Sequence, residues 1–135
     1  MKLVTFVKEK FDDGSTTRRL LGDVNGKDCI LVDDMMDSGT TIIRAAQRLK
    51  KAGAKNVYVY VCHGLFSGTA WASVCKTDAI DEVIVSNTIP ANRFSSGSSS
   101  PPEQGKIKHL SLAPLLAEAV TRLVDGKSTR GLTRL

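Results

Sequence analysis

The stretch Cys29–Ile43, which reads CILVDDMMDSGTTII, decides the fold. Its apolar residues Ile30–Val32 predict a strand that ends at Asp33 and Asp34, and the residues beyond the following loop predict a helix. The first backbone amides of a helix have no acceptor inside the helix, and the helix dipole favours an anion beside them. This order of strand, acidic pair, loop and helix therefore predicts a cradle for a phosphorylated sugar.

The loop Asp37–Thr41 adds the groups that such a cradle needs. Gly39 lets the backbone approach an anion, and Ser38, Thr40 and Thr41 offer hydroxyl donors. The carboxylates of the acidic pair would repel a phosphate, so they suit the hydroxyls of a ribose or Mg²⁺ held through water. A turn at the acidic pair and a helix cap by Ser38 or Thr40 explain the same residues without any ligand, and the local pattern leaves both interpretations open.

Composition and length predict one globular domain over residues 1–135. Hydrophobic residues make up 41% and charged residues 24% of the chain, as in ordinary globular proteins. No apolar run reaches the roughly 18 residues that span a bilayer, so we expect no membrane partner. The net charge is +5, but aromatic residues are only 5% and the basic residues are dispersed, so we expect no nucleic-acid partner.

The three cysteines, Cys29, Cys62 and Cys75, show no C-x-x-C spacing. Their odd number and apolar surroundings predict free, buried thiols in a reducing compartment. A zinc site that uses Cys62 and His63 is disfavoured, because neighbouring strand residues point to opposite faces. A histidine at the end of a strand is more often structural than catalytic, and the sequence leaves the role of His63 open.

Strands alternate with helices along the chain, which predicts an α/β fold with a mainly parallel sheet flanked by helices and ligands at the carboxyl ends of its strands. Polar residues and turn formers predict no regular element between Lys8 and Lys27. Serine, glycine and proline between Arg93 and Gly105 predict a flexible surface loop. The expected strands are Leu3–Val7, Cys29–Val32, Val57–Cys62, Glu82–Val85 and Ile107–Leu110, and the expected helices are Thr41–Ala52, Ala70–Lys76 and Pro114–Leu123.

Five segments carry a resemblance to a known family. The segment Val32–Thr41 looks like the motif that binds phosphoribosyl pyrophosphate (PRPP) in type I phosphoribosyltransferases. With Gly22–Lys27, His63–Gly68 and Ser86–Pro90, it resembles ribose-phosphate pyrophosphokinase, also called PRPP synthetase. Leu110–Ala119 is also similar to the last helix of that family. The resemblance implies a phosphoribosyltransferase-like fold and covers nearly the whole chain, but only the C-terminal half of the family.

The resemblance implies a transferase of nucleotide biosynthesis that makes PRPP and AMP from ATP and ribose 5-phosphate. Asp33 and Asp34 would hold the ribose hydroxyls and help to order Mg²⁺, and the loop residues Asp37, Ser38, Gly39, Thr40 and Thr41 would hold the 5-phosphate. Lys8 matches a catalytic lysine of the family's flexible loop, and Lys10 stands where an arginine is expected. Lysine keeps the charge there but loses the planar bidentate fork.

The N-terminal half of the family brings most of the ATP contacts, which leaves three functions open. The chain is part of an active diphosphokinase, an inactive regulatory or binding protein similar to the PRPP synthetase-associated proteins, or a phosphoribosyltransferase. We expect a homo-oligomer or an association with a full-length homologue. We expect a cytoplasmic location, and the weak alternative is a peroxisome-like organelle, because Thr133-Arg134-Leu135 faintly resembles a peroxisomal address.

Overall fold

The computed structural model describes residues 2–10, 16–90 and 105–133. Its main element is a four-stranded parallel sheet in the order β3-β4-β5-β6. These strands are β3 (Asp28–Met36), β4 (Asn56–Gly64), β5 (Glu82–Ser86) and β6 (Ile107–Leu110). Helices α1 (Thr40–Lys51) and α2 (Ala70–Lys76) connect consecutive strands, which confirms the predicted α/β fold with its parallel sheet. The expected loop at 93–105 lies almost wholly outside the described residues.

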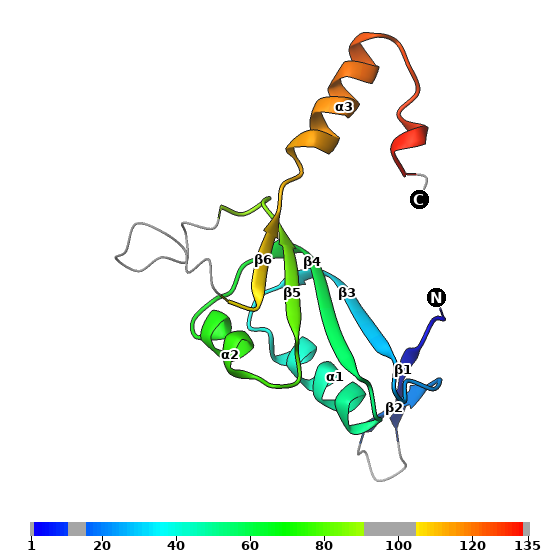
Figure 1. Cartoon of the computed structure of the whole chain (residues 1–135), viewed down its shortest axis with the longest axis vertical. Coiled ribbons are helices and arrows are strands. Elements are labelled where there is room, and N and C mark those ends of the chain that lie inside the picture. Colours follow the sequence, from blue (N-terminus) through cyan, green and yellow to red (C-terminus); the bar gives the residue numbers. More distant parts are fainter. Residues whose placement is uncertain (1, 11–15, 91–104, 134–135) are drawn as a thin grey trace.

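Helices α1 and α2 lie together on one side of the sheet, and the core fills the space between (Figure 1). Alternate residues of the inner strands point into this core, as the buried side chains of Val57, Val59 and Val61 on β4 demonstrate. Helix α1 contributes Ile42, Ala46 and Leu49 at the spacing of one helical face. The residues between these strand positions point to the other side of the sheet, on which Ile30 and Val32 are 63% and 72% exposed.

The prediction of an irregular segment from Lys8 to Lys27 is wrong. Strands β1 (Thr5–Lys10) and β2 (Thr16–Leu21) form an antiparallel hairpin that pairs Phe6 with Leu20. The hydrogen bonds between the two paired strands suffice for this hairpin, although its residues do not alternate and few of them are apolar. Partly buried side chains of Val4, Phe6 and Leu20 attach the hairpin to the core.

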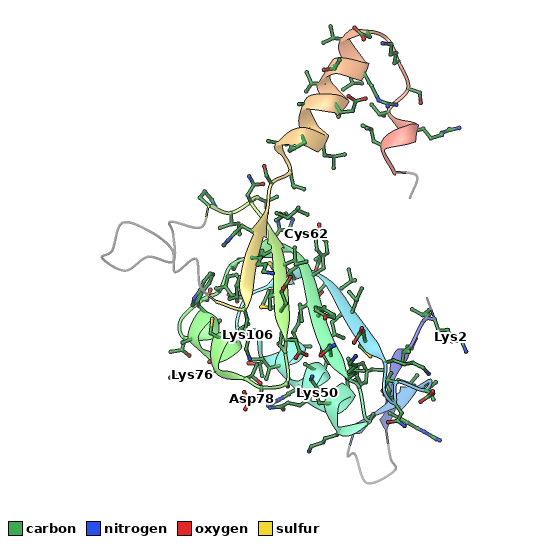
Figure 2. All side chains as sticks on the ribbon, in the orientation of Figure 1. Lys2, Lys50, Cys62, Lys76, Asp78 and Lys106 are labelled. Carbon is green, nitrogen blue, oxygen red and sulfur yellow. The ribbon has the colours of Figure 1, made fainter. Side chains whose placement is uncertain are left out.

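An ion pair closes the end of the sheet that lies opposite the strand carboxyl ends. Asp81 Oδ2 lies 2.8 Å from Lys50 Nζ and accepts a hydrogen bond of 2.7 Å from the Val57 amide. Burial raises the pKa of the Asp81 carboxyl, but these two hydrogen bonds and the positive charges of Lys50 and Lys106 together hold the pKa below its ordinary value. Lys50, at the foot of α1, and Cys62, near the end of β4, mark the two ends of the sheet in Figure 2.

Helix α3 (Ala113–Val124) follows β6 and extends away from the sheet (Figure 1). None of its residues is buried, and five large aliphatic side chains are at least 48% exposed. A 3₁₀ turn, η2 (Arg130–Thr133), follows it. No helix among the described residues is long and apolar enough to cross a membrane.

Candidate functional site

Strand β3 continues through the acidic pair and ends only at Met36, so the prediction that it stops at Asp33 and Asp34 is wrong. The reason is its parallel pairing with β4, which extends from Asp28 opposite Asn56 to Met36 opposite Gly64. Asp33 is half-buried and Asp34 is exposed, as expected for consecutive strand residues on opposite faces. One ligand reaches both carboxylates only if it lies beyond the end of β3 or along its free edge.

The loop after β3 and the first turn of α1 lie where the sequence predicts an anion cradle. Gly39 is the N-cap of α1, and no acidic residue occupies the first turn of the helix. Ser38 Oγ lies 3.2 Å from Thr40 Oγ1 and 3.5 Å from the Thr40 backbone nitrogen. The amides of Thr41 and Ile42 have no acceptor in the helix by its geometry. They remain available to a ligand at the start of the helix.

Gly39 is required by the fold itself. Its φ of 72° lies in the left-handed region, where a Cβ is strained. A Cβ added there would lie 3.2 Å from Val74 Cγ2 of α2. The glycine that was predicted to admit an anion therefore also lets α1 pack against α2.

A second loop, which follows β4, is attached directly to the end of β3. The amides of Leu65 and Phe66 donate to the carbonyl oxygen of Met36 at 2.8 and 3.2 Å. Phe66 is 4% exposed, has a φ of 47°, and meets the ring of Trp71 edge-on at a centroid distance of 5.1 Å. A non-glycine residue at positive φ persists only where its surroundings hold it, so this loop is fixed by packing.

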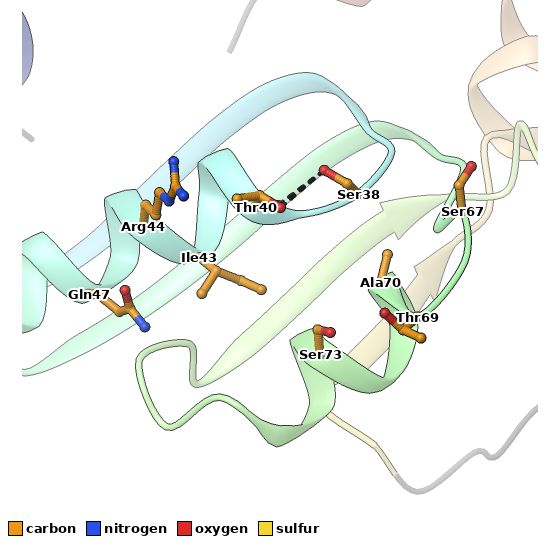
Figure 3. A pocket seen from close by; sticks show the side chains of 9 residues that line it. All are labelled: Ser38, Thr40, Ile43, Arg44, Gln47, Ser67, Thr69, Ala70 and Ser73. Carbon is orange, nitrogen blue, oxygen red and sulfur yellow. Dashed lines mark hydrogen bonds between the residues drawn. The ribbon is translucent and has the colours of Figure 1, made fainter.

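The two loops enclose an open pocket of about 390 Å³ at the carboxyl ends of β3 and β4 (Figure 3). One wall comes from the loop after β3 and from α1, and the other comes from the loop after β4 and from α2. Both walls carry polar side chains beside apolar ones. The lining residues are Ser38, Thr40, Ile43, Arg44, Gln47, Ser67, Thr69, Ala70 and Ser73.

Sequence reasoning found only Ser38 and Thr40 in this pocket. Arg44 and Gln47 follow Thr40 at helical spacing, which places all three on one face of α1 (Figure 3). That spacing could have predicted from the sequence that the cationic side chain of Arg44 lies near the predicted phosphate. The opposite wall could not be found in the same way, because only the pairing of β4 with β3 brings Ser67 and Thr69 to this edge.

The segment Ser86–Pro90 serves the fold rather than the pocket. Thr88 Oγ1 donates to the carbonyl oxygen of Cys62 at 2.9 Å, and the Ser86 hydroxyl donates to the same oxygen. His63 Nδ1 lies 2.9 Å from Thr88 Oγ1, so this histidine contacts the same segment. Asn87 Oδ1 accepts a hydrogen bond of 2.9 Å from the Leu112 amide. These contacts hold the ends of β4, β5 and β6 together.

The predicted lysines of the flexible loop lie on β1, where Lys8 pairs with Arg18 and Lys10 with Thr16 in the hairpin register. The structure describes the backbone of these residues but not their side chains. That Lys8 and Lys10 face the phosphates of ATP therefore stays a prediction.

The acidic pair is the part of the site whose chemistry suits a magnesium ion. Within the described residues, no three histidine, cysteine or acidic side chains gather around a common point. Asp33 Oδ1 accepts the Asp34 amide at 3.0 Å, and the described residues form no ion pair with either carboxylate. Carboxylate oxygens are ligands that Mg²⁺ prefers, and the ion keeps several of its waters. Two such groups fit an ion held partly through water.

All three cysteines are free and only partly buried, so the predicted free thiols are confirmed and their full burial is wrong. Burial raises the pKa of both the Cys29 and Cys75 thiols. Neither thiol lines the pocket, and neither is a reactive thiolate candidate.

Residues 5–134 match the family described as the phosphoribosyl synthetase-associated domain. The chain is 44% identical over 113 residues to ribose-phosphate pyrophosphokinase of Ralstonia nicotianae, and the match covers 84% of this chain and 34% of that protein. It is 46% identical over 109 residues to the enzyme of the same name from Haemophilus influenzae, where the match covers 81% of this chain and 32% of that protein.

A solved structure has the same fold. The crystal structure of phosphoribosylpyrophosphate synthetase from Mycobacterium smegmatis superposes with a TM-score of 0.66 at 37% sequence identity. The match covers 82% of this chain and 34% of that one. The chain thus spans about a third of the length of the curated relatives that it matches.

Proposed function

We propose, because the chain belongs to the phosphoribosyl synthetase-associated domain family, that it binds ribose 5-phosphate or PRPP at the loop that follows β3. One observation carries the proposal. The open amides of the first turn of α1 border a pocket that holds hydroxyl groups and Arg44 and contains no acidic side chain. A phosphate monoester is the anion that such donors suit.

Each part of the sugar phosphate has a proposed partner. The 5-phosphate accepts hydrogen bonds from the Thr41 amide and from the hydroxyls of Ser38, Thr40 and Thr41, while Gly39 keeps the backbone close. The backbone of Asp37 contributes more than its carboxylate, which would repel a phosphate. Asp33 and Asp34 accept hydrogen bonds from the ribose hydroxyls along the free edge of β3.

The proposed reaction is that of ribose-phosphate diphosphokinase. The ribose C1 hydroxyl attacks the β-phosphorus of ATP, the bond from that phosphorus to the AMP oxygen breaks, and the hydroxyl proton leaves to solvent, which gives PRPP and AMP. Lys8, with Lys10 in the position of an arginine, offers positive charge to the transferring phosphates. Mg²⁺, ordered by Asp33 and Asp34, neutralises phosphate charge when bound.

The chain corresponds in this proposal to the C-terminal half of the diphosphokinase. Its ATP site is completed by another chain, so activity requires a homo-oligomer or an association with a full-length homologue. A cytoplasmic location accords with the nucleotide substrates. The peroxisomal alternative depends on Thr133-Arg134-Leu135, whose last two residues lie outside the described ranges, and it stays a prediction.

A specific observation favours a second function, an inactive regulatory or binding subunit. The matching family is described as synthetase-associated, and the chain covers about a third of the named enzymes. Such a subunit would bind the sugar phosphate at the same residues without turning it over.

Isothermal titration calorimetry with ribose 5-phosphate tests the site. The double variant Asp33→Ala/Asp34→Ala should abolish measurable binding and leave the circular dichroism spectrum unchanged, because both carboxylates reach solvent. Arg44→Gln should weaken binding about tenfold, the loss of one charge-assisted hydrogen bond. Asp78→Ala is the matched control, since this exposed carboxylate lies outside the pocket.

Unchanged affinity in the double variant would remove the acidic pair from the site. AMP release from ATP and ribose 5-phosphate separates the diphosphokinase from the inactive subunit, which binds without turnover. Pyrophosphate release from PRPP in the presence of a purine or pyrimidine base would instead indicate a phosphoribosyltransferase.

A further inference from the structure

The loop after β4 contains a strained residue to which the proposed sugar-phosphate contacts give no role. Among the described residues, Phe66 is the only residue other than glycine whose φ is positive, at 47°. This backbone conformation is unfavourable for a residue with a Cβ, and it persists only where the surrounding structure imposes it. Strain of this kind gathers at binding sites, where it helps to fix a group that a ligand needs. The residues beside Phe66 are therefore candidates for contact with a ligand.

Contacts within the core hold Phe66 in this conformation. Its ring lies against Gly64, because a Cβ added to Gly64 would lie 2.5 Å from Phe66 Cε2. The ring also meets that of Trp71 edge-on at a centroid distance of 5.1 Å. The Phe66 amide donates to the carbonyl oxygen of Met36, the last residue of β3, at 3.2 Å. Phe66 thus joins the end of β4 to α2 and to the end of β3.

Two hydroxyl groups follow Phe66 closely in the chain and line the pocket. Ser67 and Thr69 lie on the wall opposite Thr40 and Arg44 (Figure 3). Thr69 is the N-cap of α2, but its side chain makes no capping hydrogen bond. Within the ranges that the structure describes, the Ser67 hydroxyl forms no hydrogen bond either. No described residue therefore competes with a ligand for these two hydroxyls.

The shape of a phosphate group calls for donors on both walls. The donors proposed so far belong to the loop after β3 and to α1, so they approach the phosphate from one side. A terminal oxygen turned toward the opposite wall would lose water without gaining a partner, which costs binding free energy. A hydroxyl on the loop after β4 supplies that partner, and no acidic side chain lines this wall to repel the phosphate.

We propose that Ser67 donates a hydrogen bond to the phosphate of the bound sugar phosphate, and that Phe66 is the positioning residue that keeps Ser67 in reach. The inference rests on the proposed function and adds a second wall to the same site. Phe66 is buried and does not touch the ligand. It acts through Ser67, because the backbone turn imposed at Phe66 sets where the next side chain lies. Thr69 offers a further hydroxyl from the same loop.

Titration calorimetry of the whole chain with ribose 5-phosphate tests the contact of Ser67. Ser67→Ala should weaken binding about tenfold, the loss of one hydrogen bond to a charged group. Ser128→Ala is the matched control, because this serine is also exposed but lies outside the pocket, and its affinity should equal that of the wild-type chain. Thermal unfolding should give the same Tm for both variants, since neither hydroxyl is buried.

A double-mutant cycle tests whether Phe66 acts through Ser67. Phe66→Leu keeps an apolar side chain in the core, and circular dichroism together with the emission of Trp71, the single tryptophan, verifies that the variant folds. Phe66→Leu should weaken binding about fivefold in the wild-type chain and less than about twofold when Ser67 is already alanine. A general loss of stability would weaken binding by the same factor in both backgrounds.

Equal factors in the two backgrounds would overturn the positioning role of Phe66, and unchanged affinity in Ser67→Ala would overturn the contact itself. If Arg44→Gln still weakens binding in that case, the sugar-phosphate site stands and only its second wall is refuted. A wild-type chain that does not bind ribose 5-phosphate would refute the proposed function and this inference together. The two proposals therefore fail in distinguishable ways.

Discussion

Replacing Gly39 with alanine should destabilise the chain through two separable effects. The left-handed backbone at φ 72° costs a residue with a Cβ about 1–2 kcal/mol. The new Cβ would lie 3.2 Å from Val74 Cγ2, which adds about 1 kcal/mol of overpacking. We expect a total loss of about 2–3 kcal/mol in the free energy of unfolding, or a fall of about 10 °C in Tm for a chain of this size.

A double-mutant cycle separates the two effects. Val74→Ala removes the methyl group that the new Cβ would meet, so Gly39→Ala should cost about 1 kcal/mol less in that background. Gly126→Ala is the matched control for the backbone cost, because Gly126 has a φ of 67° and nothing within 4 Å of an added Cβ. Gly126→Ala should therefore lower the free energy of unfolding only by the backbone cost of about 1–2 kcal/mol.

Urea unfolding followed by circular dichroism measures all four variants, and titration with ribose 5-phosphate measures their affinity. Gly39→Ala should also weaken binding, because Gly39 sets the direction of the first amides of α1. Additive free energies in the cycle would refute the contact between Gly39 and Val74. A loss no larger than that of Gly126→Ala would refute it too.

Two further perturbations report on the supports of the site. Asp81→Asn should flatten the dependence of the free energy of unfolding on pH at acid pH. The Asp81 carboxyl has a pKa below its ordinary value of 3.8 in the folded chain. Its contribution to the free energy of unfolding is therefore full above that value and is lost as the pH falls through the lower, folded-state pKa. Urea unfolding between pH 6 and the acid transition checks this, and an unchanged slope in the variant would contradict it. Phe66→Ala should cost about 3 kcal/mol, because Phe66 is 4% exposed and contacts Trp71 edge-on, whereas Phe66→Leu should cost clearly less. Thermal unfolding compares the pair, and equal losses would argue against packing as the cause.

The periodicity of the sequence predicted most of the sheet and helices, because their apolar residues repeat at intervals of two or of three to four. The α2 helix at Ala70–Lys76 and the β6 strand at Ile107–Leu110 have the predicted bounds. The sequence did not predict the hairpin of β1 and β2, because β2 begins with Thr16 and Thr17 and continues with two arginines. Pairing with a neighbouring strand, which no local pattern reveals, is what makes this segment a strand.

The extent of β3 was underestimated for a related reason. Two aspartates are poor strand residues in isolation, but the ladder with β4 supplies hydrogen bonds past them to Met36. The same pairing separates the two carboxylates onto opposite faces, which constrains where a ribose could lie. The proposed roles of Asp33, Asp34 and the loop residues remain predictions for the binding experiments.

The sequence alone determined the alternation of strands and helices and the small-residue turn at Gly39, because both follow from local backbone and side-chain preferences. Only the tertiary structure decided that Ser67 and Thr69 face Arg44 across a pocket, since residues so far apart in the chain meet through the sheet. Only the tertiary structure shows which aliphatic side chains are buried, as for Val57, Val59 and Val61 of β4, because burial depends on what lies opposite a side chain and not on its neighbours in sequence.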